Sequence, residues 1–357
     1  MKKRLLPLVL CSQKYTPFLL VAWVTMMTVS IHAAPDPHST RFSHKNWDVV
    51  CDNTLTCRAA GYSADDSEPA VTVLLTRAAG VETSVSNRVM FAEYDDQTRE
   101  PHDQTEAPIL LINDRSMGQL LTADDDAWQM NSAQFNAFLL ALRNDNPIRF
   151  EQNDQTYLLS SAGSSAVLLK MDEIQGRIET PTALIKKGNN SESQVTPPVA
   201  MPVIIQAAVQ DKESREMNAT EKSLFKPLIS KSLNTQTDCD EELINGSWQM
   251  ARLDRQYTLI IVPCWYAAYN SGNVYFVVNQ DKSSRVMVTE SGNYYADGTV
   301  GFWMKGRGLG DCISLEEWVW NGESYVHSTV KDTGRCRLIR AGGSWDLPTL
   351  VTKVVSP

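Results

Sequence analysis

Short runs of alternating apolar and polar residues, separated by turn-forming residues, cover most of this 357-residue sequence. Such alternation puts successive side chains on opposite faces of a strand, and closely spaced runs favour antiparallel pairing. In the first half of the chain we expect strands at residues 47–51, 56–62, 70–77, 85–94, 108–113, 148–150 and 156–159. The pattern therefore predicts a largely antiparallel β-structure.

Two helical patterns interrupt this first series of strands. Asn131 precedes apolar residues that recur at i, i+3, i+4 and i+7 from Phe135, and Gln134 stands in capping-box spacing to Asn131. A second helix is expected to start at Ser164 or Ser165 and to end at Gly176. Residues 34–186 are thus predicted to form an α+β domain, an antiparallel sheet with two helices.

Residues 187–238 differ in composition and are predicted to form a linker. The segment is polar at first, carries Pro197, Pro198 and Pro202, and becomes strongly charged between residues 211 and 231. Within it, residues 203–209 are interpreted as a strand or docking segment. Residues 221–233 are interpreted as a short helix.

Strand patterns return at close spacing in residues 239–357, which we predict to be an all-β, antiparallel domain. The expected strands are residues 247–253, 257–263, 274–279, 285–290, 300–304, 317–320, 324–330 and 335–339. Turn sequences such as Asp297-Gly298 and Asn321-Gly322 separate them, because glycine supplies the positive φ that tight hairpins require. Six of the nine tryptophans and seven of the eleven tyrosines lie between residues 239 and 345, so the domain is rich in aromatic residues.

The first 33 residues have the composition of a secretory signal peptide. They hold four basic residues and no acidic ones, and an uncharged run from Phe18 to Ile31 is followed by Ala33 and Ala34. The run is shorter than the roughly 20 residues of a spanning helix. We therefore expect cleavage and a soluble periplasmic protein without a membrane span, and retention of the segment as an anchor is the alternative.

The mature chain is acidic. Removing the four basic residues of the leader lowers the formal net charge from −9 to −13. Binding to phosphate backbones needs clustered Lys and Arg side chains. We expect no nucleic-acid partner.

Six cysteines remain after the leader and are expected to form three disulfides, as in other exported proteins. Cys51 and Cys57 are close enough in sequence to join one hairpin. The other four allow three pairings, of which we favour the sequential one, Cys239 with Cys264 and Cys312 with Cys336, because each closes a loop of about 25 residues. No C-x-x-C spacing supports zinc, and we expect neither a metal nor a cofactor.

Several motifs spread over nearly the whole mature chain are arranged as in a known family. They are Phe42-x4-Trp47-Asp-Val-Val-Cys51 with Cys57-Arg-Ala-Ala-Gly-Tyr62, Gly176-Arg177-x3-Pro181, Pro263-Cys264-Trp-Tyr-Ala-Ala-Tyr-Asn270, Arg307-Gly-Leu-Gly-Asp-Cys312 and Trp318-Val-Trp-Asn-Gly322. In these segments the chain resembles the exported Gram-negative family catalogued as domain of unknown function 1176. The resemblance implies an exported, disulfide-containing protein and supplies no catalytic residues. The Trp-Asp-x-x-Cys opening is also similar to the invasion-associated protein B family.

Two features are candidates for ligand binding. Glycines at positions 306, 308 and 310 flank Arg307 and precede Asp311, so a ligand could approach the backbone closely while the two charged side chains make polar contacts. The alternative is a structural loop in which Arg307 simply pairs with Asp311. Rings that could form a stacking platform, or instead fill the core, are Trp265, Tyr266, Tyr269, Trp303, Trp318 and Trp320.

Evidence for catalysis is thin. The cysteines are expected to be paired, no G-x-S-x-G motif is present, and His327 is the one histidine after residue 102. Glu316 and Glu317 are adjacent in an expected strand, so they point to opposite faces and cannot act as a paired acid and base. We interpret the chain as a non-catalytic periplasmic binding or envelope-associated protein whose partner is an envelope ligand or protein. The alternatives are a secreted hydrolase that acts on a cell-wall or protein substrate and a periplasmic enzyme inhibitor.

Amino-terminal sequencing of the mature protein tests the leader. Because Ala33 and Ala34 follow the apolar run, we expect the mature sequence to begin at Ala34. Recovery of intact Met1 in a membrane fraction would contradict export as a soluble protein.

Overall fold

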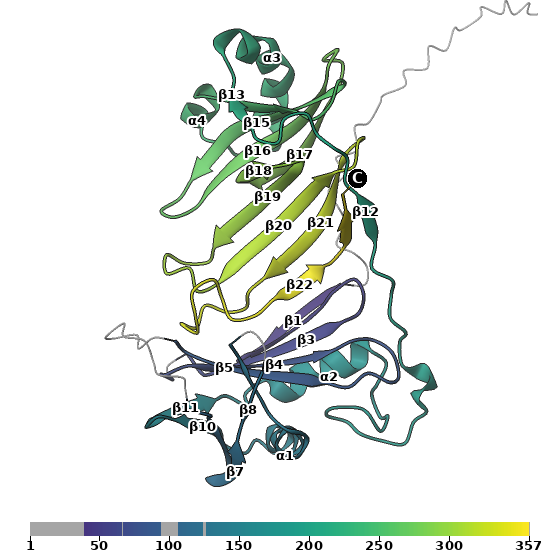
Figure 1. Ribbon diagram of the computed structural model, residues 1–357, viewed down its shortest axis with the longest axis vertical. Coiled ribbons are helices and arrows are strands. Elements are labelled where there is room, and N and C mark those ends of the chain that lie inside the picture. The colour runs from purple at the N-terminus through teal and green to yellow at the C-terminus, as the bar shows by residue number, and fades with distance from the viewer. Residues whose placement is uncertain (1–38, 66, 94–105, 124–125, 357) are drawn as a thin grey trace, which may run out of the picture. The chain divides into compact units, whose positions relative to one another are not determined.

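Strands form most of the regular structure in this computed structural model, which describes residues 39–65, 67–93, 106–123 and 126–356 (Figure 1). The expected mostly-β architecture of several antiparallel sheets is confirmed. The predicted signal peptide and its cleavage point lie outside the described residues. No helix among the described residues is long and apolar enough to cross a membrane.

The first part of the chain forms two antiparallel sheets and two helices. The seven-stranded sheet runs in the order β1 (Thr40–His44), β2 (Trp47–Cys51), β3 (Cys57–Tyr62), β4 (Val71–Arg77), β5 (Ser86–Phe91), β9 (Trp128–Gln129) and β8 (Leu121–Thr122). The four-stranded sheet runs β11 (Gln155–Leu159), β10 (Ile148–Gln152), β6 (Ile109–Ile112) and β7 (Arg115–Gln119). Helices α1 (Ser132–Arg143) and α2 (Ser164–Ile174) contribute Phe138 and Met171 to one shared core with these sheets.

The predicted capping box of the first helix is confirmed. The Asn131 side chain accepts hydrogen bonds from the backbone amides of Ala133 and Gln134, and the Gln134 side chain accepts one from the Asn131 amide. The second helix begins after Gly163, whose φ is +98°. A Cβ there would lie 1.9 Å from the His44 carbonyl oxygen, so the close approach of this helix to β1 requires glycine.

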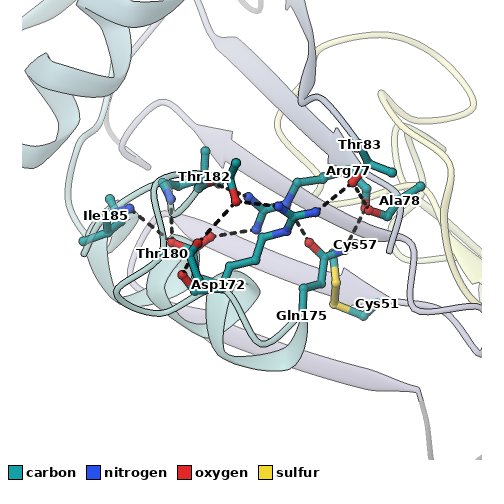
Figure 2. Close-up of polar contacts among 12 residues, drawn as sticks. Cys51, Cys57, Arg77, Ala78, Thr83, Asp172, Gln175, Thr180, Thr182 and Ile185 are labelled. Carbon is teal, nitrogen blue, oxygen red and sulfur yellow. Dashed lines mark hydrogen bonds and ion pairs between the residues drawn. A yellow bond between two sulfur atoms is a disulfide. The ribbon is translucent and has the colours of Figure 1, made fainter. Parts of the chain in front are cut away.

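A buried ion pair joins α2 to the seven-stranded sheet (Figure 2). The Arg77 guanidinium donates to Asp172 at 2.7 Å and to the Gln175 side chain at 2.6 Å, and all three side chains are almost fully buried. The second Asp172 oxygen accepts the backbone amides of Leu184 and Ile185. Because every charge has a partner, this contact stabilises the packing of α2 and of the segment after it.

The second part of the chain forms two five-stranded antiparallel sheets. Their orders are β13 (Arg215–Glu216), β14 (Gln249–Arg252), β15 (Tyr257–Tyr266), β16 (Ser271–Asn279) and β17 (Arg285–Gly292), then β18 (Tyr294–Ala296), β19 (Thr299–Lys305), β20 (Ile313–Trp320), β21 (Tyr325–Asp332) and β22 (Leu347–Leu350). Only Asn293 separates β17 from β18, and Figure 1 shows strands β15 to β21 following one another in space. The two sheets therefore meet at a seam around Asn293.

The segment expected to be a linker contributes to the core of this second part. It contains a short 3-10 helix (Glu192–Gln194), strand β12 (Val203–Ile205), which pairs in parallel with β23 (Lys353–Val355), and helix α3 (Ala219–Gln236). Ile229 and Leu233 of α3 are buried against β15 and β16. The helix is longer than expected, and packing of its apolar residues on the sheet stabilises it.

Two expectations for residues 239–357 are wrong. A short helix, α4 (Glu241–Asn245), lies in the region expected to be all-β. Residues 335–339 are not a strand: the Leu338 amide donates to Asp311, and the Ile339 carbonyl accepts the Glu93 amide. These backbone groups form single hydrogen bonds with different parts of the chain, so residues 335–339 do not pair with a neighbouring strand.

The predicted division into two domains stays a prediction. The described residues group into one compact unit. Ile339, Trp345 and Leu347 share a buried cluster with Val50 and Tyr62 of the first sheet. Arg335 donates two hydrogen bonds to Asp48, at 2.8 and 2.7 Å.

All six expected disulfide cysteines are paired, in the arrangement that the spacing favoured. Cys51 and Cys57 face each other across β2 and β3, and the other bonds join Cys239 to Cys264 and Cys312 to Cys336.

Removing the Arg77 guanidinium should destabilise the fold strongly, because Asp172 would keep a buried charge without its counter-ion. For Arg77→Met we expect a loss of about 3–5 kcal/mol in the free energy of unfolding. Arg215→Met is the matched control, since Arg215 forms an exposed pair with Glu221 and should cost under about 1 kcal/mol. Urea unfolding measures both, and equal losses would contradict a stabilising role for the buried pair.

Candidate functional site

An open hollow of about 690 Å³ lies at the seam between the two five-stranded sheets. One wall comes from the turn between β15 and β16, and the other from β18, β19 and β20. The residues that line it are Tyr266, Ala267, Tyr269, Asn270, Ser271, Asn293, Tyr294, Trp303 and Leu315. The hollow is thus built by residues that are up to about 50 positions apart in the sequence.

Two asparagine side chains hold the walls together. The Asn270 side chain donates to the Lys305 carbonyl and accepts the Lys305 amide, both at 3.0 Å. The Asn293 side chain does the same with the amide and carbonyl of Trp303. Strand β18 pairs only with the first residues of β19, and the two asparagine side chains occupy the strand edge beyond that pairing. The turn after β15 and the seam at Asn293 are therefore both bonded to β19.

Three of the six candidate aromatic residues line the hollow and are exposed. The exposed fractions are 72% for Tyr266, 46% for Tyr269 and 38% for Trp303. Tyr266 ends β15, Tyr269 lies in the turn after it and Trp303 lies on β19, so a flat ligand in the hollow could contact more than one of these rings.

The other three candidate aromatic residues have structural roles. Trp265 lies over Gly272 on the paired strand, where a Cβ would be 2.2 Å from its indole nitrogen. Trp318 stacks on the His327 ring, with centroids 4.6 Å apart, and Trp320 is fully buried. The sequence prediction of Trp265 as a ligand contact stays a prediction, and the packing favours its alternative as a core residue.

The alternating glycines pack against side chains and a disulfide. A Cβ at Gly306 would lie 2.6 Å from the Cys312 sulfur, so this position has no room for a side chain. A Cβ at Gly308 would lie 3.6 Å from the Tyr269 ring, and one at Gly310, whose φ is +70°, would lie 3.4 Å from the Lys305 stem. The loop therefore supports one wall of the hollow, which accounts for its unusual sequence without a ligand.

Arg307 and Asp311 pair with each other. The guanidinium donates two hydrogen bonds to the carboxylate, at 2.7 and 2.6 Å, and the Leu338 amide donates a third at 2.8 Å. Burial acts to raise the pKa of Asp311, but these hydrogen bonds outweigh it and hold the pKa below its usual value. The geometry favours the structural interpretation of this pair, and a ligand contact there stays a prediction.

The carboxylates near the seam are also engaged. The Tyr294 hydroxyl donates to Glu317 at 2.7 Å, and burial together with this carboxylate raises the pKa of Tyr294. Glu316 lies 3.4 Å from the His327 imidazole. The two glutamates therefore serve different partners, as their alternation predicted.

The residues described hold one cluster with metal-ligand character, Asp311 with Cys312 and Cys336. Both cysteines are bonded to each other, so neither offers the thiolate that a metal would bind.

Asn270 and Asn293 line the hollow, although the sequence did not indicate them as site residues. Asn270 ends the motif that begins at Pro263, and Asn293 follows a turn-forming Ser-Gly pair. Nothing in the local sequence indicates that their side chains bind the backbone of a distant strand.

Arg307→Ala should lower the stability of the protein because it leaves the buried Asp311 carboxylate with fewer donors. Allowing for the partial exposure of Arg307, we expect a loss of about 1–2 kcal/mol at pH 7. The pKa of Asp311 in the folded protein is below its unfolded value of about 3.9. The ion pair therefore stabilises the fold fully above about pH 3.9, and this stabilisation is lost as the pH falls through the folded-state pKa. Urea unfolding at pH 7 and pH 3 should show a smaller difference from wild type at pH 3, and an equal difference would contradict the ionic role.

Comparison with known proteins places the chain in a family without an assigned activity. The family described as "Protein of unknown function (DUF1176)" matches residues 41–352. The uncharacterised protein YpfG of Escherichia coli (strain K12) is 24% identical over 351 residues, which cover 87% of this chain and 92% of that protein. No solved structure matches. The likeness of the first hairpin to the invasion-associated protein B family is not shown, whereas the match over residues 41–352 means that the chain belongs to the DUF1176 family.

Proposed function

We propose that this protein is a periplasmic, non-catalytic binding protein and that its ligand stacks in the aromatic hollow. The observation that carries the proposal is the exposure of Tyr266, Tyr269 and Trp303 around one open hollow. Aromatic rings that fill a core are covered, and exposed rings gathered at one place are typical of binding surfaces. Paired cysteines support an oxidising compartment outside the cytoplasm.

The rigid setting of the rings supports the same proposal. Asn270 ties the Tyr269-bearing turn to β19, and Asn293 ties the seam to Trp303. A site whose side chains are already held in place loses little conformational entropy when it binds. The hollow is within the size range of small-ligand sites.

The alternative of a hydrolase has less support. His327 stacks on Trp318 and lies beside Glu316. Neither neighbour supplies the hydroxyl or thiol that a nucleophilic triad requires.

An enzyme inhibitor is the second candidate, because Tyr266 is strongly exposed at the end of a hairpin. Asn270 fastens that turn to β19, so Tyr266 belongs to the wall of a hollow. An inhibitor that inserts an aromatic residue into an enzyme would present it on a free loop, whereas this turn is held to β19.

Removing one of the exposed rings should weaken ligand binding without unfolding the protein. We expect Tyr266→Ala and Trp303→Ala each to weaken binding to soluble fragments of digested peptidoglycan by about tenfold. Leu158→Ala, which removes an equally exposed apolar side chain from β11, is the control and should bind as wild type does.

Isothermal titration calorimetry measures the affinities, and thermal melting checks that all variants are folded. Equal affinities of wild type and both ring variants would contradict the proposal.

A further inference from the structure

We propose that the ligand of the hollow is a saccharide that carries a carboxylate, and that the Lys305 ammonium binds this acid group. The inference rests on the proposed binding function and adds the chemical class of the ligand.

Lys305 places a positive charge next to the stacking platform. It follows Trp303 by two positions on β19, so both side chains leave the same face of the strand. The ammonium lies 5.9 Å from the centroid of the Trp303 ring, and the side-chain stem runs along Gly310. Its backbone is held at both the amide and the carbonyl by Asn270.

This ammonium is available to a ligand. Within the described part of the chain, Lys305 forms no ion pair, and its ammonium lies over the Trp303 ring. The acids on the adjoining loop and strand have other partners: Asp311 binds Arg307, and Glu317 accepts from Tyr294. A neutral ligand would leave this charge unused, whereas a carboxylate would form a charge-assisted hydrogen bond with it.

The strand edge in the hollow argues for a saccharide over a peptide. An extended peptide gains affinity by pairing its backbone with the free edge of a sheet. At the hollow, the amides and carbonyls of Trp303 and Lys305 are already paired with Asn293 and Asn270. Ring stacking on Tyr266, Tyr269 and Trp303 is what remains, and the apolar face of a pyranose suits flat rings with polar tips.

The test compares three saccharide probes by isothermal titration calorimetry on the mature protein at low salt. The neutral probe is an oligomer of N-acetylglucosamine. The two acidic probes distinguish the source of the carboxylate: a glycan of alternating N-acetylglucosamine and N-acetylmuramic acid carries lactyl carboxylates, and oligogalacturonate carries uronic ones. Lys305→Gln removes the proposed contact, and Lys353→Gln, on the exposed strand β23, is the matched control for loss of one charge.

We expect wild type and Lys353→Gln to bind at least one acidic probe about tenfold more tightly than the neutral one, and Lys305→Gln to lose this preference while its affinity for the neutral probe is unchanged. A preference that survives Lys305→Gln, or equal binding of all probes by wild type, overturns the inference and leaves the proposed function standing. Absence of binding to all three probes also overturns it. If a probe binds but Tyr266→Ala binds it equally, the proposed function itself fails.

Discussion

Four asparagine side chains take the place of a neighbouring strand in this fold. Each donates its amide to the carbonyl of one residue and accepts the amide of that same residue; the pairs are Asn53 with Val351, Asn87 with Met130, Asn270 with Lys305 and Asn293 with Trp303. Buried backbone groups without partners are costly, and free strand edges invite association with other chains. The four pairs therefore close the ladder where strands end, and two of them also shape the candidate site.

Three aromatic rings lie opposite a glycine on the paired strand and are packed into the structure, whereas two of the rings in the hollow lie opposite a larger residue and are exposed. Trp47 faces Gly61, Trp265 faces Gly272 and Tyr294 faces Gly301 across paired strands, and a Cβ at any of these glycines would lie within 2.3 Å of the ring. Each ring folds over its glycine and is held there. Tyr266 and Trp303 instead face Ser271 and Leu315, which line the hollow with them. The residue across the strand pair thus accounts for which rings remain available to a ligand.

The seven-stranded sheet supports the second part of the chain through the segment that follows β21. Arg335 binds Asp48 and lies over the Tyr62 ring, and the Trp345 indole donates to Thr72 at 2.8 Å. The same segment carries Cys336, whose partner Cys312 ends the glycine-rich loop. The candidate site and the first sheet are therefore linked by covalent and polar contacts within one compact unit.

The sequence by itself determined the local features of this protein. Alternating apolar residues predicted nearly all the long strands, the Asn131 and Gln134 spacing predicted the first helix and its cap, and cysteine spacing favoured the disulfides that formed. The strands and the helix cap depend on residues close in the chain, and each disulfide closes a loop of 25 residues or fewer. Residues 335–339 show the limit, because their apolar pattern reflects burial against a distant sheet.

Only the tertiary structure decided which candidate side chains form a site. From the sequence, Arg307, Asp311 and six aromatic residues were equal candidates for ligand binding. In the folded protein Arg307 and Asp311 pair with each other, and three of the six rings are buried or packed on other residues. Tyr266, Tyr269 and Trp303 lie exposed around a hollow. Asn270 and Asn293 also line the hollow, and both bind the backbone of β19 through contacts that no local pattern encodes. Exposure and pairing depend on what lies across a strand, and that neighbour is set by the register of the sheets.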